Sequence, residues 1–262
     1  MTRTLAATVF AAIGAVSIWF GGWWTLGFAM IMGAVMVWEW RGIARRKERT
    51  VIAGFQIVAV VGATYLAFAG RFDVALAFLV VIAVVGALID AALHRQPWWN
   101  LVGVIYIGLA LCFFVVIRQR PDEGLQAIIW LILIVVATDT GAYFAGRSLG
   151  GPKLWPRVSP GKTWSGAIGG VVAAAVMAWA IGALAGRPLM IGAEATAIFV
   201  SIVSQGGDLL ESAYKRRFGV KDSGSIMPGH GGALDRMDGL LAASLAVGIA
   251  SIFRPGSPVW AW

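Results

Sequence analysis

Apolar residues run through almost the whole chain in blocks that are separated by short polar stretches. Each block holds about 20 residues, the length at which an α-helix crosses the hydrocarbon core of a bilayer. A backbone in lipid must satisfy its own hydrogen bonds, so we predict that these blocks are helices. The nine predicted transmembrane helices cover residues 4–20, 22–40, 51–69, 74–92, 100–117, 125–145, 166–185, 189–210 and 237–254. The predicted fold class is an all-α integral membrane protein.

The composition excludes an ordinary soluble domain. Of the 262 residues, 59% are hydrophobic and 13% are charged, with a mean hydropathy of +0.81. If the N-terminus is cytoplasmic and the helices alternate in direction, 16 of the 21 Lys and Arg residues lie on the cytoplasmic side. The positive-inside rule therefore predicts a cytoplasmic N-terminus. Basic residues at that face suit anionic lipid headgroups. Because these bases lie in loops between helices, we expect no nucleic-acid partner.

Polar character divides the chain into two regions. Residues 1–124 form five predicted helices with short loops, whereas residues 125–262 carry most of the conspicuous polar residues. We expect one membrane domain with its site in the C-terminal half, facing the cytoplasm. Glu39 and Asp90 lie near the ends of predicted helices. We interpret them as side chains that reach toward the membrane surface.

The most polar part of the chain is residues 204–239, here called the polar segment. It holds five acids, five bases, one His and eight Gly between two apolar helices. Asp235 and Asp238 are three residues apart and share a helix face, so we expect them to meet Asp208 at one depth. Carboxylate oxygens are ligands that Mg²⁺ prefers, and two such ions would clamp an in-line phosphoryl displacement. The alternative is that these acids and bases only pair with each other at a solvated face.

A second polar cluster covers residues 137–166. Asp139 lies inside a predicted helix and Tyr143 follows on the same face. A buried acid needs a metal or a basic partner on a neighbouring helix.

The same cluster contains Lys162 and Thr163, which invite comparison with a P-loop. The G-x-x-x-x-G-K-[ST] pattern fails, because Pro156 occupies the first Gly position and we expect no strand before it. Lys162 and Thr163 stay candidate phosphate-binding residues.

These two clusters resemble the phosphatidate cytidylyltransferase family, also called CDP-diacylglycerol synthase. The family signature S-x-hydrophobic-K-R-x4-K-D-x-small-x2-apolar-P-x-H-G-G-apolar-x-D-R-apolar-D appears as Ser212, Lys215, Arg216, Lys221, Asp222, Gly224, Pro228, His230, Gly231, Gly232, Asp235, Arg236 and Asp238. The upstream family stretch D-x-x-A-Y-x-x-G-R…S-P-x-K-T-x-E-G appears as Asp139, Ala142, Tyr143, Gly146, Arg147, Ser159, Pro160, Lys162, Thr163 and Gly166. The family Glu is replaced by Ser165, so the role of that acid does not carry over. The match covers about 100 residues of the C-terminal half.

The resemblance implies that CTP and phosphatidate react to give CDP-diacylglycerol and pyrophosphate. It implies Mg²⁺ as cofactor, either two divalent ions or one divalent and one monovalent ion. The implied metal ligands are Asp208, Asp235 and Asp238, and the implied catalytic residues are Asp208, Asp235, Lys215 and Arg236. The implied substrate-binding residues are Ser159, Lys162, Thr163, Arg216, Lys221, Asp222, His230, Gly231, Gly232, Asp139 and Tyr143.

The resemblance also implies CTP, phosphatidate and membrane lipid as partners, and a location in the bacterial inner membrane. We consider a homodimer for a small multi-span enzyme. The alternatives are a cytidylyltransferase for another lipid phosphate, such as an isoprenoid or ether lipid, and an ion-coupled transporter that uses Asp139, Asp208 and Glu194. The transporter reading expects two symmetric halves, which the sequence does not display. A CDP-alcohol phosphotransferase is disfavoured, because its D-G-x2-A-R…G-x3-D-x3-D run is missing.

Overall fold

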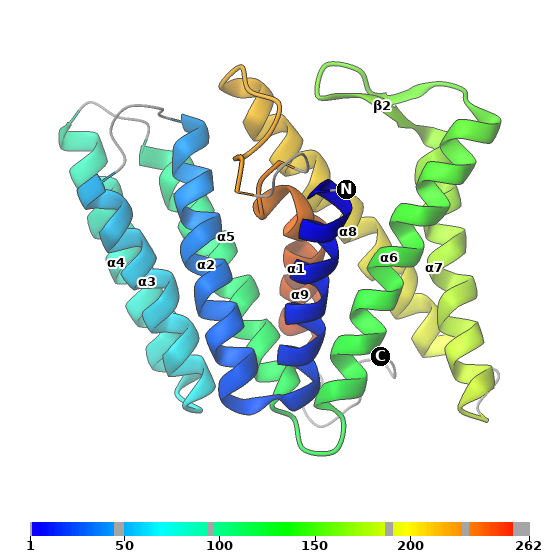
Figure 1. The fold of residues 1–262 in the computed structure, drawn as a ribbon, viewed down its shortest axis with the longest axis horizontal. Helices are drawn as coiled ribbons and strands as arrows, with labels where there is room; N and C mark the ends of the chain where they lie inside the picture. The colour runs from blue at the N-terminus through cyan, green and yellow to red at the C-terminus, as the bar shows by residue number, and fades with distance from the viewer. Residues whose placement is uncertain (1, 45–49, 94–96, 187–190, 227–230, 254–262) are drawn as a thin grey trace. The chain divides into compact units, whose positions relative to one another are not determined.

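The computed structural model describes residues 2–44, 50–93, 97–186, 191–226 and 231–253 (Figure 1). These ranges contain nine α-helices and one β-hairpin. The helices are α1 (Thr2–Phe20), α2 (Gly22–Ala44), α3 (Thr50–Phe68), α4 (Phe72–Ala92), α5 (Pro97–Arg118), α6 (Gly124–Leu149), α7 (Trp164–Leu184), α8 (Ile191–Arg217) and α9 (Leu234–Phe253). Each coincides with one predicted apolar block, so the all-helical fold class is confirmed.

Length and hydropathy identify the helices suited to a bilayer. Among the described residues, six helices are long and apolar enough to cross a membrane, namely α2, α4, α5, α6, α7 and α9. The shorter segments Thr8–Phe20 of α1 and Ile52–Phe68 of α3 are also apolar. α8 differs because its C-terminal half continues into the polar segment as far as Arg217.

The chain folds into two compact units. The first contains Met1–Leu125 and Arg217–Met237, and the second contains Gln126–Arg216 and Asp238–Trp262. The polar segment is therefore shared between the units, with residues 217–237 folding with the N-terminal helices.

The first unit is a helical bundle in which α2 and α3 each pack against α5 and α3 packs against α4 (Figure 1). The spacing of small and apolar residues on α4 explains this packing. Ala75, Leu79, Ala83 and Gly86 recur every three or four residues and are buried, whereas Val81 on another face is exposed. A helix with this pattern buries one stripe in the bundle and leaves apolar side chains for lipid.

A buried ion pair lies within the first unit, where α2 and α4 end and α3 and α5 begin. Arg41 donates from Nη1 and Nη2 to the Asp90 carboxylate at 3.2 and 3.1 Å, and Asn100 Nδ2 donates to Asp90 at 2.6 Å. Gln56 Oε1 accepts a further bond from Arg41 at 3.2 Å. The side chains of Arg41 and Asp90 are 2% and 0% exposed. Our interpretation of Asp90 as a surface-reaching acid is wrong, because three neighbouring helices enclose it.

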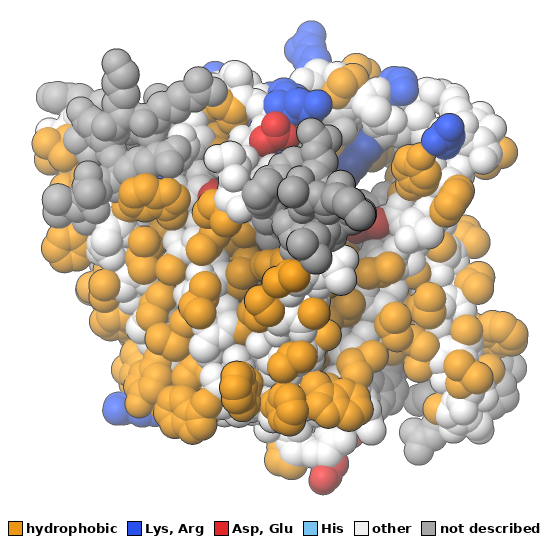
Figure 2. Space-filling view, viewed as in Figure 1, with side chains coloured by type: hydrophobic (Ala, Val, Ile, Leu, Met, Phe, Trp, Pro, Cys, Tyr) orange, Lys and Arg blue, Asp and Glu red, His pale blue; other side chains and the backbone are white. Residues whose placement is uncertain are grey.

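The second unit contains α6 and α7, which pack closely through small residues. A Cβ on Gly166 would lie 2.8 Å from the Ala142 carbonyl oxygen, and one on Gly170 would lie 2.8 Å from the Thr138 carbonyl oxygen. Gly166, Gly170, Ala174 and Ala178 form a buried stripe on α7 with a spacing of four residues. Such stripes let two helix backbones approach each other in lipid. Hydrophobic side chains cover much of the surface visible in Figure 2, as expected for a protein embedded in a bilayer.

A β-hairpin links α6 to α7 in the second unit. β1 (Lys153–Trp155) pairs antiparallel with β2 (Ser159–Thr163), with Lys153 opposite Thr163 and Trp155 opposite Ser159. We expected no strand here, because the rest of the chain is predicted to be helical and embedded in a membrane. Strands of three and five residues are too short to show an alternating pattern. β2 runs directly into α7, whose N-cap is Thr163. Lys162 therefore lies one residue before a helix N-cap.

Candidate active site

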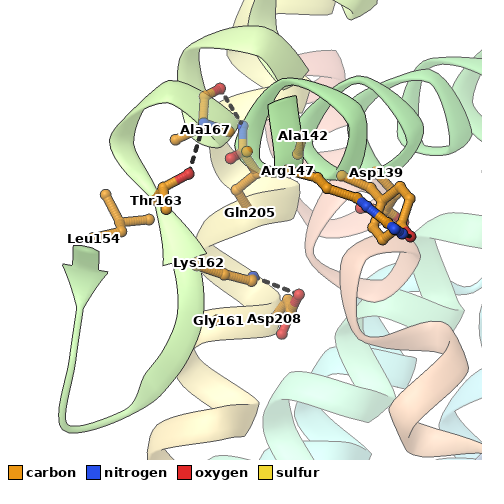
Figure 3. Close-up of a pocket in the computed structure, with 13 residues that line it drawn as sticks. Asp139, Ala142, Arg147, Leu154, Gly161, Lys162, Thr163, Ala167, Gln205 and Asp208 are labelled. Atoms are coloured by element: carbon orange, nitrogen blue, oxygen red, sulfur yellow. Dashed lines mark hydrogen bonds and ion pairs between the residues drawn. The ribbon is translucent and has the colours of Figure 1, made fainter. Parts of the chain in front are cut away.

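A cavity of about 560 Å³ opens in the second unit between α6, the hairpin, α7 and α8 (Figure 3). Five residues predicted from the sequence line this cavity, and they come from three different elements. They are Asp139, Tyr143, Lys162, Thr163 and Asp208. The volume falls in the range typical of small-molecule sites.

The central interaction in this cavity is an ion pair between the hairpin and α8. Lys162 extends from β2 toward Asp208, and its Nζ lies 2.5 Å from Asp208 Oδ2 (Figure 3). The two side chains are 29% and 35% exposed. Ser212 Oγ also donates to Asp208 Oδ1 at 3.3 Å, from one turn further along α8. Because both charged groups remain open to the cavity, a ligand can reach either of them.

Further carboxylates lie close enough to Asp208 to interact with it electrostatically. Asp139 on α6 is near both Asp208 and Lys162, and Asp238 on α9 is near Asp208, Asp139 and Lys215. Acidic groups thus gather around Asp208, and their oxygen atoms suit a hard divalent cation. Within the described part of the chain, they do not already form a ready-made cage of three or more ligands. This arrangement fits Mg²⁺, which usually takes one or two carboxylates and completes its shell with substrate phosphate and water.

Other predicted residues in the second unit make structural contacts. Lys215 Nζ lies 3.0 Å from Glu211 Oε1 one turn earlier on α8, and Arg216 Nε donates to the Val158 carbonyl at 3.3 Å. The second contact joins α8 to the turn of the hairpin. Ser159 begins β2.

At the α6 side of the cavity, Arg147 donates to the Tyr143 hydroxyl at 2.6 Å, and Tyr143 is 56% exposed.

The N-terminus of α7 is organised by hydroxyl groups. Thr163 Oγ1 accepts a hydrogen bond from Gly166 N at 3.1 Å, which is the usual action of an N-cap. Ser165, which replaces the family Glu, donates to the Gly150 carbonyl and lies 3.0 Å from Thr163 Oγ1. Ser165 thereby connects the start of α7 to the end of α6.

Asp235, in the first turn of α9, holds described residues of the segment between α8 and α9. Its Oδ2 atom accepts hydrogen bonds from Gly232 N at 2.8 Å and from Ser223 N and Oγ at 2.9 Å. Gly231 has φ of +82°, and a Cβ there would lie 2.6 Å from Asp235 Oδ2. Glycine is therefore required at this position for both conformation and space.

Other signature residues of the first unit are exposed. Lys221 and Asp222 line a second cavity, of about 510 Å³, within the first unit. Arg236 is also exposed. His230 lies outside the described residues. The expected meeting of Asp208 with Asp235 stays a prediction.

Glu39 is a residue that we did not predict to belong to the site. It lies near the end of α2, is 2% exposed, and accepts hydrogen bonds from Ala233 N and Leu234 N. Its interpretation as a surface-reaching acid is wrong, because the loop before α9 covers it. An acid within the apolar run of α2 was the available signal, but nothing in the local sequence identified its partner.

Fold and site together define an integral membrane protein of apolar helices that carries a cavity with clustered acids, a lysine and a helix N-terminus. The sequence matches the model of the family described as "Cytidylyltransferase family" over residues 1–253. The chain belongs to this family.

Individual relatives extend the comparison. A Brucella suis protein named phosphatidate cytidylyltransferase is 38% identical over 245 residues, which cover 93% of this chain and 90% of the relative. A Haemophilus influenzae protein of the same name is 34% identical over 82% of this chain and 86% of the relative. A Bacillus subtilis protein of that name is 47% identical over 138 residues, about half of each chain. The similarity to the first two proteins therefore includes the N-terminal helices.

Proposed function

We propose that this chain is a phosphatidate cytidylyltransferase, which converts CTP and phosphatidate into CDP-diacylglycerol and pyrophosphate. The observation that carries the proposal is the cavity in which Lys162 and Asp208 meet, because both residues belong to the sequence clusters that resemble this family. Relatives of that name match the chain almost from end to end, which supports the same substrate pair.

The reaction demands electrostatic stabilisation more than proton transfer. A phosphate oxygen of phosphatidate attacks the α-phosphorus of CTP, a new P–O bond forms, and the bond to the β-phosphate breaks as pyrophosphate leaves. The attacking oxygen is already anionic, so no strong general base is required. The obstacle is to bring two polyanions together and to stabilise the charge of the leaving group. A cavity that offers both a lysine and carboxylates able to hold a cation meets this requirement.

We assign the following roles in the second unit. Lys162 binds a phosphate of CTP or of phosphatidate, while Asp208 and Asp238 would hold Mg²⁺ and Asp139 would orient them. When bound, Mg²⁺ neutralises phosphate charge and polarises the reacting phosphorus. In the structure Lys162 pairs with Asp208. A partly exposed ion pair contributes little stability. Substrate phosphate can therefore bind Lys162 and the cation can bind Asp208 at a small cost in free energy for separating the two side chains.

The rest of the family signature, at the end of α8 and in the first unit, supplies the remaining assignments. Asp235 is a further proposed ligand, and Lys215, Arg216, Lys221 and Arg236 supply positive charge to the phosphates. His230, Gly231 and Gly232 are proposed to shape the nucleotide site.

We further propose nine transmembrane helices, a cytoplasmic N-terminus and a location in the bacterial inner membrane with the site facing the cytoplasm. The clustering of Lys and Arg on one predicted side supports this orientation. A homodimer stays a prediction.

The test is incorporation of labelled CTP into chloroform-soluble lipid by purified protein in the presence of phosphatidate and Mg²⁺. We expect labelling that requires phosphatidate, releases pyrophosphate and is abolished by EDTA. Labelling with a polyprenyl or ether-lipid phosphate but not with phosphatidate would assign another acceptor. Folded protein without labelling on any lipid phosphate would refute the proposal, and labelling that survives EDTA would refute the role of the metal.

A further inference from the structure

An acid on α2, Glu39, contacts the segment between α8 and α9, whose described residues are 218–226 and 231–233 and which is here called the signature loop. Glu39 Oε1 accepts a hydrogen bond from Ala233 N at 3.0 Å, and Glu39 Oε2 accepts one from Leu234 N at 2.8 Å. Ser223 Oγ lies 3.3 Å from the same Oε2 atom. All of these residues belong to the first unit. One buried carboxylate thus contacts both ends of the loop that carries the signature.

These contacts replace an ordinary helix cap. Leu234 is the first residue of α9, and the first N–H groups of a helix have no intrahelical acceptor. A side chain from the cap residue itself usually satisfies them, but here the acceptor comes from α2, 195 residues away in the sequence. A carboxylate at this position is also stabilised by the helix dipole. Glu39 therefore stabilises the N-terminus of α9.

The contact with Glu39 leads directly to the signature acid Asp235. Ser223 Oγ lies 2.9 Å from Asp235 Oδ2 and 3.3 Å from Glu39 Oε2, so one hydroxyl connects the two carboxylates. Gly232 N donates to Asp235, and the next two N–H groups along the chain donate to Glu39. A displacement of Glu39 would therefore displace the backbone that sets the position of Asp235.

The loop is shaped to fit this carboxylate closely. A Cβ on Gly224 would lie 2.5 Å from Glu39 Oε1, and a Cβ on Gly232 would lie 2.5 Å from Glu39 Oε2. Both positions are glycine, so the backbone approaches the carboxylate from two sides. Glu39 also lines the second cavity together with Lys221 and Asp222. The end of α2 thus lines the same cavity as the signature residues Lys221 and Asp222.

The position of Glu39 is itself fixed by the bundle. Two residues further along α2, Arg41 is bound to Asp90 and Gln56. Between them, Trp40 Nε1 donates to the Trp99 carbonyl of α5 at 2.9 Å. A side chain whose next two neighbours in the helix are anchored in this way can hold a loop precisely, as positioning groups require.

We propose that Glu39 is a positioning residue for nucleotidyl transfer, which holds the start of α9 and with it Asp235 and Arg236. The inference rests on the proposed function for its activity readout. A carboxylate is required because two N–H donors approach its two oxygens. In Glu39→Gln one of these atoms becomes an N–H₂ group, which cannot accept, so one backbone donor loses its partner.

The test compares Glu39→Gln with Leu79→Ala in the purified full-length enzyme. Leu79 is fully buried on α4, and its truncation lowers stability without contact to the loop. For Glu39→Gln we expect kcat to fall roughly tenfold or more, while KM for CTP changes by less than about threefold because phosphate-binding side chains remain. For Leu79→Ala we expect a lower melting temperature with the kcat of the folded protein retained. A similar fall of kcat in both variants would overturn the proposal.

A second readout does not depend on catalysis. Amide hydrogen exchange of peptides that cover residues 231–237 reports on the cap directly. We expect faster exchange in Glu39→Gln and wild-type exchange there in Leu79→Ala, even if the wild-type enzyme shows no activity on phosphatidate. Unchanged exchange together with near-normal kcat in Glu39→Gln would overturn the proposal. If Glu39→Gln does not fold, Ser223→Ala serves as the second variant, because it removes the hydroxyl shared by both carboxylates. We expect Ser223→Ala to lower kcat and to speed amide exchange at residues 231–237, both by less than Glu39→Gln would. Wild-type kcat and exchange in Ser223→Ala would also overturn the proposal.

Discussion

Removal of one partner of the buried Arg41–Asp90 pair should destabilise the protein far more than removal of both. The carboxylate accepts two bonds from Arg41 and one from Asn100, at 2.6 to 3.2 Å, and both charged side chains are essentially inaccessible. In Asp90→Leu the guanidinium stays buried, and among the described residues Gln56 Oε1 is its remaining side-chain acceptor. An uncompensated buried charge of this kind typically costs about 3–5 kcal/mol.

The expected change in melting temperature follows from this energy. For chains of this size, 1 kcal/mol corresponds to roughly 2–4 °C, so Asp90→Leu and Arg41→Met should each lower the apparent melting temperature by roughly 6–20 °C. The double variant Arg41→Met/Asp90→Leu removes both charges and replaces them with apolar side chains of similar size. Since such replacements are often neutral, we expect it to melt well above either single variant.

The assay is thermal unfolding of the three variants and the wild-type protein in one detergent at one scan rate, followed by tryptophan fluorescence. A fixed scan rate is needed because unfolding of membrane proteins is often irreversible. Thr64→Val is a matched control in the same bundle, since Thr64 is buried but carries no charge and bonds to its own helix. The reasoning would be refuted if the double variant melted at or below the lower of the two single variants, because the cost would then come from lost packing and not from an unpaired charge.

Three further predictions concern the second unit. Lys162→Ala should lower kcat/KM about 10- to 100-fold through the loss of a charged phosphate contact. Steady-state kinetics at varied CTP and phosphatidate would check this, and unchanged kinetic constants for both substrates would mean that Lys162 only pairs with Asp208. Asp208→Asn should lower kcat by roughly 100- to 1,000-fold with an unchanged melting temperature, and near-normal kcat would exclude it as a metal ligand. Gly166→Ala, whose Cβ would lie 2.8 Å from the Ala142 carbonyl, should cost about 1–3 kcal/mol and lower the melting temperature, whereas Gly206→Ala, with open space around it, should not.

Helix positions were predictable because the signal is local. Each apolar block carries its own reason to be helical in a bilayer, and blocks such as 22–40 and 166–185 match α2 and α7 to within a few residues. The candidate residues on α6, α8 and the hairpin were also predictable, since Asp139, Lys162 and Asp208 belong to sequence patterns of fixed spacing. The structure places all three around one cavity, and their roles in the reaction stay predictions.

The hairpin was missed for a different reason. Its strands are too short to display alternation, and they are stabilised by pairing with each other between two helices.

The sequence by itself determined the helices, the membrane character and the family of this protein, because these depend on composition and on short-range spacing. Only the tertiary structure decided the roles of Glu39, Arg41 and Asp90. An acid near the end of an apolar helix looks the same in the sequence whether it reaches water or is enclosed. Asp90 finds Arg41 49 positions away, and Glu39 finds the start of α9 195 positions away. The packing of helices brings these partners together, and burial then makes each contact strong enough to matter.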